Sequence, residues 1–256
     1  MIQNNILITG ASSGIGYALA CQYAQKGYGI IGVGRNEMRL NELEKWIKTH
    51  TQTPIYILNL DLGKEGAARD IEKWLAERHL EIDILINNAG FGLFGNFADT
   101  DITQELNMIN VQIKNYLELS KMALTQMLKR DRGKIINISS LYAWLSVPRQ
   151  SVYAATKTFM DMHATALQYE LRKTPIEIYL VFPGAVDSRF LEGQRKIDST
   201  YSKPDKVAKI IIEAVEHKKA IIVPGVLNKI LGCMARILPR SWLLFLIDRI
   251  NSQRGL

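Results

Sequence analysis

The sequence has little cysteine: Cys21 and Cys233 are the only two among 256 residues, and they lie far apart. Neither belongs to a CxxC pair or another metal-ligand spacing, so we expect no disulfide framework and a reducing compartment. Long apolar runs are also missing, because no window reaches the roughly 18 apolar residues of a membrane-spanning helix. The opening residues MIQNN do not begin a basic and apolar leader, so no secretory signal is expected. These absences together predict a cytoplasmic protein.

Histidines are few as well, and none of the four has a neighbour at a metal-ligand spacing. They are His50, His79, His163 and His217. We therefore expect surface or helix positions for them, and no bound metal.

Acidic residues are scarce in the last part of the chain. From Lys218 to Leu256, seven lysines and arginines accompany one acid, Asp248, within a formal net charge of +7 for the whole protein. Residues 1–217 are therefore nearly neutral. A chain whose body has no basic excess offers little to a nucleic acid, so we expect no nucleic-acid partner.

The sequence instead alternates short apolar runs with longer amphipathic stretches. The apolar runs, expected to be strands, are 6–9, 28–34, 55–60, 82–87, 134–139, 176–182 and 220–223. The expected helices are 14–26, 37–50, 64–79, 103–130, 151–173 and 204–218. Continuously apolar strands are typical of a parallel sheet that is buried on both faces. The pattern predicts an α/β fold: one doubly wound Rossmann domain with a parallel sheet of about seven strands and helices on both faces.

We expect residues 1–225 to form this domain, and residues 226–256 to form a basic amphipathic extension packed on it. The extension mixes apolar side chains with four basic ones between residues 226 and 250, and Pro239 separates two short helical stretches. A basic amphipathic pair of helices could lie peripherally on a membrane surface. It could equally cap a substrate site or form a subunit interface. The sequence leaves these alternatives open.

Three glycines lie in the turn between the first strand and the first helix, in the run TGASSGIG at residues 9–16. Glycine is needed where a side chain would keep the backbone from a pyrophosphate, and the helix that follows presents N–H groups to phosphate. An ordinary loop is the alternative interpretation. The residues of this turn expected to bind a dinucleotide are Gly10, Ser12, Ser13, Gly14, Ile15 and Gly16.

The end of the second strand bears on the choice of cofactor. An acid at this position binds the ribose of NAD, whereas a nearby arginine accommodates the 2′-phosphate of NADP. Here no acid stands at the strand end, and Arg35 comes directly after Gly34. The sequence therefore favours NADP(H) over NAD(H). Asp61 and Leu62, after the third strand, are expected to border the adenine, although a plain loop is the alternative for Asp61.

Tyr153 and Lys157 are four residues apart on an expected helix, so they share one face. An ammonium close to a phenol favours the phenolate and lowers the tyrosine pKa from about 10, as a general acid or base requires. Ser140 ends the fifth strand, where its hydroxyl could hydrogen-bond a substrate oxygen. Asn110 lies inside the long expected helix, where it could hold a water or bend the helix. By itself the YxxxK spacing is common, and a surface pair is the alternative.

Taken together, these motifs resemble the short-chain dehydrogenase/reductase family over about residues 4–225. The resemblance also rests on Asn87-Asn88-Ala89-Gly90 after the fourth strand and on Pro183-Gly184 after the sixth. It implies an oxidoreductase that interconverts a ketone or aldehyde and an alcohol with a nicotinamide cofactor. Further cofactor-binding positions implied by it are Asn88, Ala89, Gly90, Tyr153, Lys157, Pro183, Gly184, Val186 and Ser188. Ser188 stands where the family often has threonine.

The resemblance also assigns roles to the four catalytic candidates. Tyr153 would exchange a proton with the substrate oxygen, and Ser140 would orient that oxygen. Lys157 would lower the pKa of Tyr153 and bind the nicotinamide ribose, and Asn110 would hold a water of the proton relay. Relatives of this kind often assemble through their long helices, so we expect a homodimer or a homotetramer.

Aromatic and aliphatic side chains near the expected site suggest an apolar substrate, such as a lipid, a steroid or an acyl compound. They are Phe91, Leu93, Phe94 and Phe97 after the fourth strand, and Tyr142, Trp144 and Leu145 after the fifth. Core or interface packing is the alternative for each, and we expect at least one of the second group to line a pocket. A non-catalytic nucleotide-binding or membrane-surface protein is the alternative function on the same fold.

Overall fold

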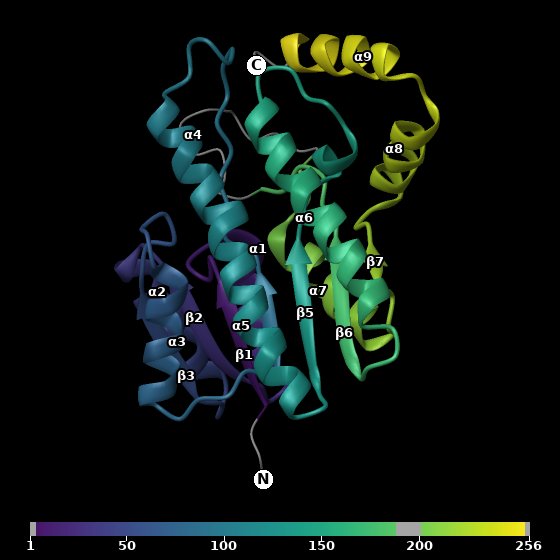
Figure 1. Ribbon diagram of the computed structural model, residues 1–256. Coiled ribbons are helices and arrows are strands. Elements are labelled where there is room, and N and C mark those ends of the chain that lie inside the picture. Colours follow the sequence, from purple (N-terminus) through teal and green to yellow (C-terminus); the bar gives the residue numbers. More distant parts are fainter. Residues whose placement is uncertain (1–3, 188–200, 254–256) are drawn as a thin grey trace.

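A parallel sheet runs through the computed structural model, which describes residues 4–187 and 201–253 (Figure 1). Its seven strands lie in the order β3-β2-β1-β4-β5-β6-β7, and every neighbouring pair is parallel. The strands are β1 (Asn5–Thr9), β2 (Gly29–Gly34), β3 (Ile55–Asn59), β4 (Ile84–Asn87), β5 (Gly133–Ile138), β6 (Ile176–Val181) and β7 (Ile221–Ile222). The order reverses between β1 and β4, so ligands are expected at the carboxyl ends of these strands. The predicted doubly wound fold is confirmed.

Helices cover both faces of the sheet (Figure 1). They are α1 (Gly14–Gln25), α2 (Glu37–His50), α3 (Ala67–Glu77), α4 (Ile102–Ile109), α5 (Asn115–Lys129), α6 (Ser151–Glu170), α7 (Pro204–Glu216), α8 (Val226–Ile237) and α9 (Arg240–Gln253). Local signals set several of their ends. The Asn36 side chain accepts a hydrogen bond from the Arg39 amide at the start of α2, and Pro204 begins α7.

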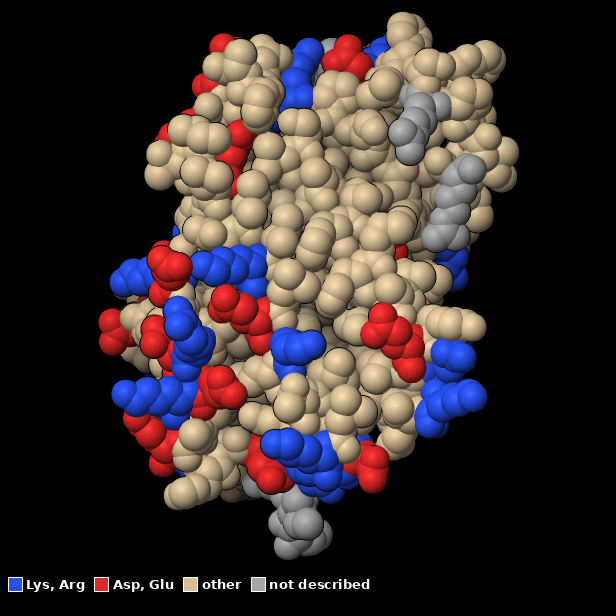
Figure 2. Space-filling view, viewed as in Figure 1, with Lys and Arg blue, Asp and Glu red and all other residues tan. Residues whose placement is uncertain are grey.

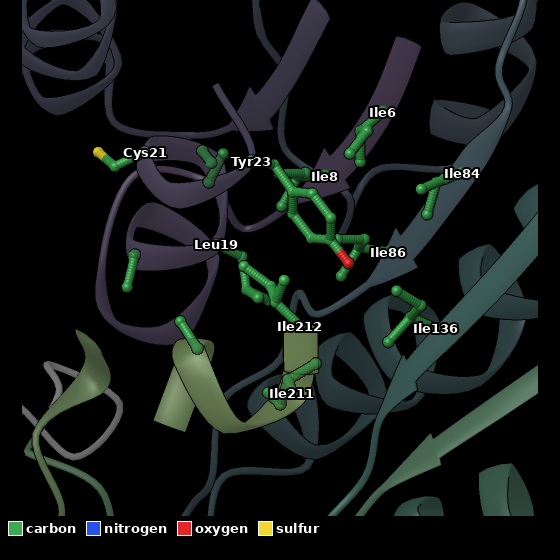
Figure 3. Close-up of a cluster of buried hydrophobic side chains, with 14 of the residues drawn as sticks. Ile6, Ile8, Leu19, Cys21, Tyr23, Ile84, Ile86, Ile136, Ile211 and Ile212 are labelled. Carbon is green, nitrogen blue, oxygen red and sulfur yellow. The ribbon is translucent and has the colours of Figure 1, made fainter. Parts of the chain in front are cut away.

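The sheet separates two hydrophobic cores. On one face α1, α2 and α7 pack on the strands, through side chains that include Ile8, Leu19 and Ile211 (Figure 3). On the other face α3, α5 and α6 cover side chains that include Leu7 and Leu85. Because each strand buries residues on both faces, its sequence is apolar throughout rather than alternating.

The long helix expected at 103–130 is interrupted. Helix α4 ends at Ile109, a π-helical turn spans Asn110–Lys114, and α5 then begins. The Asn115 side chain explains the break, because its Nδ2 donates to the carbonyl oxygens of Asn110 at 3.1 Å and of Leu62 at 2.6 Å. Its Oδ1 accepts from the Ala68 amide at 3.0 Å. Turns of this kind inside helices are frequent at functional sites.

The last two helices lie beyond the carboxyl ends of the strands, at the upper right of Figure 1. On α8, Gly232 faces the indole ring of Trp144, and on α9 Leu243 is buried. The Asp248 carboxylate of α9 pairs with the Arg149 guanidinium at 3.6 Å. In the part of the chain that the structure describes, no helix combines the length and apolar character needed to cross a bilayer.

Candidate active site

The glycine-rich turn after β1 is shaped by backbone that only glycine adopts readily. Gly10 and Gly14 have φ angles of +68° and +57°, in the left-handed region. A Cβ on Gly16 would overlap the Gly10 carbonyl oxygen and the Asn88 side chain. The turn delivers the chain to the N-terminus of α1, whose first N–H groups have no partner inside the helix. This arrangement suits a phosphate group.

Thr9 connects this turn to the loop after β4. Its hydroxyl oxygen accepts hydrogen bonds from the amides of Asn88 and Ala89, both at 3.0 Å, and donates to the Ile86 carbonyl at 3.2 Å. The Asn88 side chain returns the contact by donating to the Thr9 and Gly10 carbonyls at 2.9 and 3.2 Å. Reasoning from the sequence gave Thr9 no role, although it is the last residue of a strand directly before a glycine turn.

Asn87 lies next to this loop and acts within the sheet. Its Nδ2 donates to the Ser120 hydroxyl at 3.0 Å and to the Asn137 side chain at 2.9 Å. Both contacts are buried, so Asn87 joins β4, β5 and α5 at the carboxyl end of the sheet.

The end of β2 lies beside the same turn. A Cβ on Gly34 would meet the Ser12 hydroxyl at 3.2 Å, which places the strand end against the turn. Arg35 follows and is exposed. Asp61 uses its carboxylate locally, because Oδ1 accepts from the Gly63 amide at 2.9 Å. Leu62 is buried, with its carbonyl held by Asn115.

Tyr153 and Lys157 lie on the first turns of α6 and are both buried, with 7% and 3% of their surfaces exposed. The Lys157 ammonium is 5.8 Å from the centre of the Tyr153 ring. It donates to the Ile138 carbonyl at the end of β5, over 3.0 Å. Burial lowers the pKa of Lys157 to about 8, because the charged form loses its hydration. The surface-pair alternative for these residues is therefore wrong.

The pKa of Tyr153 moves opposite to the expected direction. Burial raises it above its ordinary value and outweighs the hydrogen bond with the Ser140 side chain, which lowers it. The lysine does not reverse this, because its ammonium is directed at the Ile138 carbonyl and is itself desolvated. The phenol is accordingly held in its protonated form, which is the form that donates a proton.

The two serines after β5 have different contacts. Ser140 shares a hydrogen bond with Tyr153, and its Oγ accepts from the Tyr142 amide at 3.2 Å. Ser139 is buried and donates to the Lys157 carbonyl at 3.3 Å, which is a structural contact within the fold.

The π-helical turn reaches α6 through two residues that the sequence did not single out. Gln112 is fully buried, and its Nε2 donates to the Thr156 hydroxyl at 2.9 Å. That hydroxyl in turn donates to the Tyr153 carbonyl at 2.7 Å. Asn110 begins the turn, and its Nδ2 lies 3.5 Å from the Gly63 carbonyl. The helix break at Asn110 is thus connected to the helix that bears Tyr153.

The chain after β6 passes close to the same region. The Pro183 carbonyl accepts from the Leu141 amide at 3.2 Å, and a Cβ on Gly184 would overlap the Asn228 side chain of α8. Val186 forms a bridge with Ser202. The expected cofactor residue Ser188 lies outside the described residues.

The apolar side chains that follow β4 and β5 divide into those that border the site and those that pack in the core. The Tyr142 ring contacts the Tyr153 ring edge-on at 6.2 Å, and Leu93 lines a small cavity with Tyr153. Trp144 packs instead on Phe182, with 4.2 Å between ring centres, and donates to Asp161 at 2.9 Å.

The other members of that group differ in how far they are buried. Phe91 packs against the core, whereas 67% of Phe97 is exposed.

The His163 ring hydrogen-bonds the Tyr116 hydroxyl at 2.8 Å, which is a packing contact. Within residues 4–187 and 201–253, no three His, Cys, Asp or Glu side chains group as metal ligands would.

Comparison with known proteins agrees with this arrangement. The family model for short chain dehydrogenases matches residues 4–198. An uncharacterized oxidoreductase of Staphylococcus epidermidis is 35% identical over 73% of this chain and 80% of its own. A very-long-chain 3-oxoacyl-CoA reductase of Danio rerio is 30% identical over 82% of this chain and 68% of its own.

Solved structures share the fold. A short-chain dehydrogenase from Sphingobium yanoikuyae, in complex with NADPH, superposes with a TM-score of 0.81 at 24% identity, over 93% of this chain and 97% of its own. The family model covers most of the chain, and both relatives reach 30% identity over more than two thirds of it. The chain therefore belongs to the short-chain dehydrogenase/reductase family and is an oxidoreductase of that family.

Proposed function

We propose that this protein uses NADP(H) to interconvert a ketone or aldehyde and an alcohol on an apolar substrate. The observation that carries the proposal is the buried Tyr153 phenol, which is hydrogen-bonded to Ser140. The centre of its ring lies 5.8 Å from the Lys157 ammonium. A phenol kept protonated by burial, beside a cation that can stabilise its conjugate base, is a proton donor for a substrate oxygen.

The glycine turn fits a dinucleotide. Positive φ angles at Gly10 and Gly14 and the close approach at Gly16 bring bare backbone to the N-terminus of α1, where a pyrophosphate would be bound. We also assign the cofactor to side-chain or backbone atoms of the turn after β1, of the loops after β2, β3, β4 and β6, and of the first turns of α6. These positions are Ser12, Ser13, Ile15, Arg35, Asp61, Leu62, Asn88, Ala89, Gly90, Tyr153, Lys157, Pro183, Gly184, Val186 and Ser188.

Arg35 supports NADP(H) over NAD(H). It is exposed directly after β2, on the strand end that lies against Ser12. A guanidinium at this position would pair with a 2′-phosphate, and no carboxylate stands at the strand end itself to bind a ribose diol instead. The solved neighbours do not decide the question, since one is described with NADPH and another, from Burkholderia phymatum, with NAD.

The chain's own residues would move the proton, while the bound nicotinamide supplies or accepts the hydride. In reduction, Tyr153 donates its phenolic proton to the carbonyl oxygen that Ser140 orients. Lys157 then stabilises the phenolate by its charge. Asn110, at the π-helical turn, would hold a water through which the site regains its proton. In oxidation the same groups act in reverse.

Aromatic and aliphatic side chains beside Tyr153 support an apolar substrate. Tyr142 contacts Tyr153, and Leu93, Met108 and Val152 line the small cavity beside it, together with polar residues that include Thr100, Glu105 and Arg149. The Danio rerio relative is described as a reductase of very-long-chain 3-oxoacyl-CoA, a substrate with a long apolar chain. We therefore favour lipid-like, acyl or steroid ketones over small polar ones.

Within the whole chain, residues 1–225 would form the catalytic domain and residues 226–256 an extension on it.

We further propose a homodimer or homotetramer that assembles through α5 and α6. Met162 and Tyr169 on α6 expose 64% and 68% of their surfaces, which leaves apolar side chains available for such an interface. Sedimentation velocity on the purified protein would measure the assembly.

The function is tested by cofactor binding and by turnover with a substrate panel. Purified protein is titrated with NADPH and NADH, and then supplied with ketones that include steroids and 3-oxoacyl thioesters. We expect tighter binding of NADPH and its oxidation by apolar ketones. Binding without turnover would favour a non-catalytic nucleotide-binding protein, and the absence of binding would contradict the proposed function altogether.

A further inference from the structure

Helix α8 turns one polar or small face toward the body of the protein. Asn228 lies against Gly184, and Gly232 lies against the ring of Trp144. The opposite face is apolar and exposed, although large apolar side chains are normally buried. Its exposed members are Val226, Leu227, Ile230, Leu231, Met234 and Ile237.

Helix α9 buries an apolar residue against the body of the protein, but it also exposes large apolar side chains, next to the charged Asp248 and Arg249. Leu243 is buried, whereas Trp242 and Phe245 expose 70% and 69% of their surfaces. These two residues are three apart, so they lie on the same side of the helix. We call the exposed apolar side chains of α8 and α9 the tail surface. So many exposed large apolar side chains on two successive helices are typical of an interaction site.

Helices α8 and α9 lie beside the proposed catalytic site. Asn228 of α8 contacts the loop that bears Gly184, and Asp248 of α9 pairs with Arg149, four residues before Tyr153. Figure 2 shows that charged side chains gather on the lower half of this face, that acidic side chains lie at its upper left over α4, and that the middle of the upper half is largely uncharged. Whatever covers the tail surface therefore lies against the outer side of two helices that border the proposed site.

Charge distinguishes the candidate occupants. Residues 226–253, which contain α8 and α9, carry four basic residues and one acid, and Lys229 and Arg249 are exposed on these helices. A second copy would bring an equally basic segment against it, and like charges oppose such a contact. An anionic lipid surface offers the complementary charge together with an apolar interior. Exposed tryptophan is also typical of the boundary between lipid and water.

We propose that α8 and α9 bind the protein peripherally to an anionic membrane surface, with the tail surface inserted among the lipids. This docking does not depend on the proposed redox chemistry. The consequence for that chemistry is that an apolar substrate could pass from the lipid layer to Tyr153 without crossing water.

The test is co-sedimentation of the full chain with vesicles. We expect binding to phosphatidylcholine vesicles that contain phosphatidylglycerol, and at least tenfold weaker binding to pure phosphatidylcholine or at high salt. The double variant I237S/W242S should lose at least tenfold in binding. The matched variant M38S/L128S removes exposed apolar side chains from α2 and α5 and should bind as the wild type does. Exchanging the charges in K229E/R249E should weaken binding only to the anionic vesicles.

Three results would overturn the proposal. The first is no binding of the wild type to anionic vesicles at low salt. The second is equal binding by the wild type and I237S/W242S. The third is a wild type that binds no vesicles but forms an oligomer, which I237S/W242S converts to monomers. The last result would make the tail surface a subunit interface. Tyr153→Phe serves as the separate control, since it should abolish turnover and leave vesicle binding unchanged. Failure of docking and failure of the proposed catalysis are thereby distinguished.

Discussion

The Lys157 ammonium donates a hydrogen bond to the Ile138 carbonyl over 3.0 Å. The contact joins the helix that bears Tyr153 to the carboxyl end of β5, one residue before the pair Ser139-Ser140. Because the donor is charged and buried, the contact fixes the orientation of α6 while it costs solvation of the ammonium. The burial of Lys157 therefore accounts both for the fixed position of its ammonium and for its lowered pKa.

The pH dependence of stability should show this cost. Lys157 has a pKa of about 8 in the folded protein, against about 10.4 for an unperturbed lysine. Between these values the unfolded chain binds more protons than the folded one, so the free energy of unfolding should rise with pH. We expect the rise in wild type and a smaller one in Lys157→Met, by urea unfolding at several pH values. Lys129→Met, on the last turn of α5, is the control and should retain it. Equal slopes in wild type and Lys157→Met would contradict the assignment.

Thr9 should stabilise the loop after β4. Thr9→Val keeps the shape but leaves the part-buried Asn88 and Ala89 amides without their acceptor. An unpaired polar group costs about 1–3 kcal/mol when it is fully buried, and a part-buried one costs less. We expect lower stability by thermal unfolding and weaker NADPH binding. Thr9→Ser keeps the hydroxyl and should behave much like wild type. If valine and serine proved equivalent, the hydroxyl would not hold the loop.

Arg35 should discriminate between the two nicotinamide cofactors. Loss of a charge-assisted contact to a 2′-phosphate costs about 1.5–3 kcal/mol, which is roughly a tenfold to hundredfold change in affinity. Arg35→Ala should therefore raise the Kd for NADPH by this factor and leave that for NADH nearly unchanged, as measured by fluorescence titration. Arg78→Ala, on the far end of α3, is the control with the same loss of charge. An equal change for both cofactors would remove Arg35 as the selecting residue.

The sequence was informative where local patterns decide the structure. Continuous apolar runs predicted the parallel sheet. The sequence at residues 9–16 predicted the tight turn after β1, in which only glycine fits at position 16. It was not informative about tertiary contacts. The break at Asn110 depends on Asn115 reaching Leu62 and Ala68, which belong to other parts of the fold.

Two features of the site were also beyond sequence reasoning. The pKa of Tyr153 moves upward because the phenol is buried, and the spacing of Tyr153 and Lys157 carries no information about burial. Gln112 and Thr156 connect the π-helical turn to Tyr153 only after α6 has packed on that turn.

The central claim is that Tyr153 is the proton donor, and Tyr153→Phe tests it most directly. The variant keeps the ring and removes the hydroxyl, and Tyr142→Phe is the matched control, since it removes a neighbouring hydroxyl from a ring in contact with Tyr153. The measurement is kcat/KM for reduction of the best ketone in the panel, together with the Kd for NADPH. The account predicts a loss in kcat/KM of about 10²–10⁴-fold for Tyr153→Phe with a far smaller change in the Kd for NADPH, and little change in either for Tyr142→Phe. Turnover by Tyr153→Phe at the wild-type rate would contradict it.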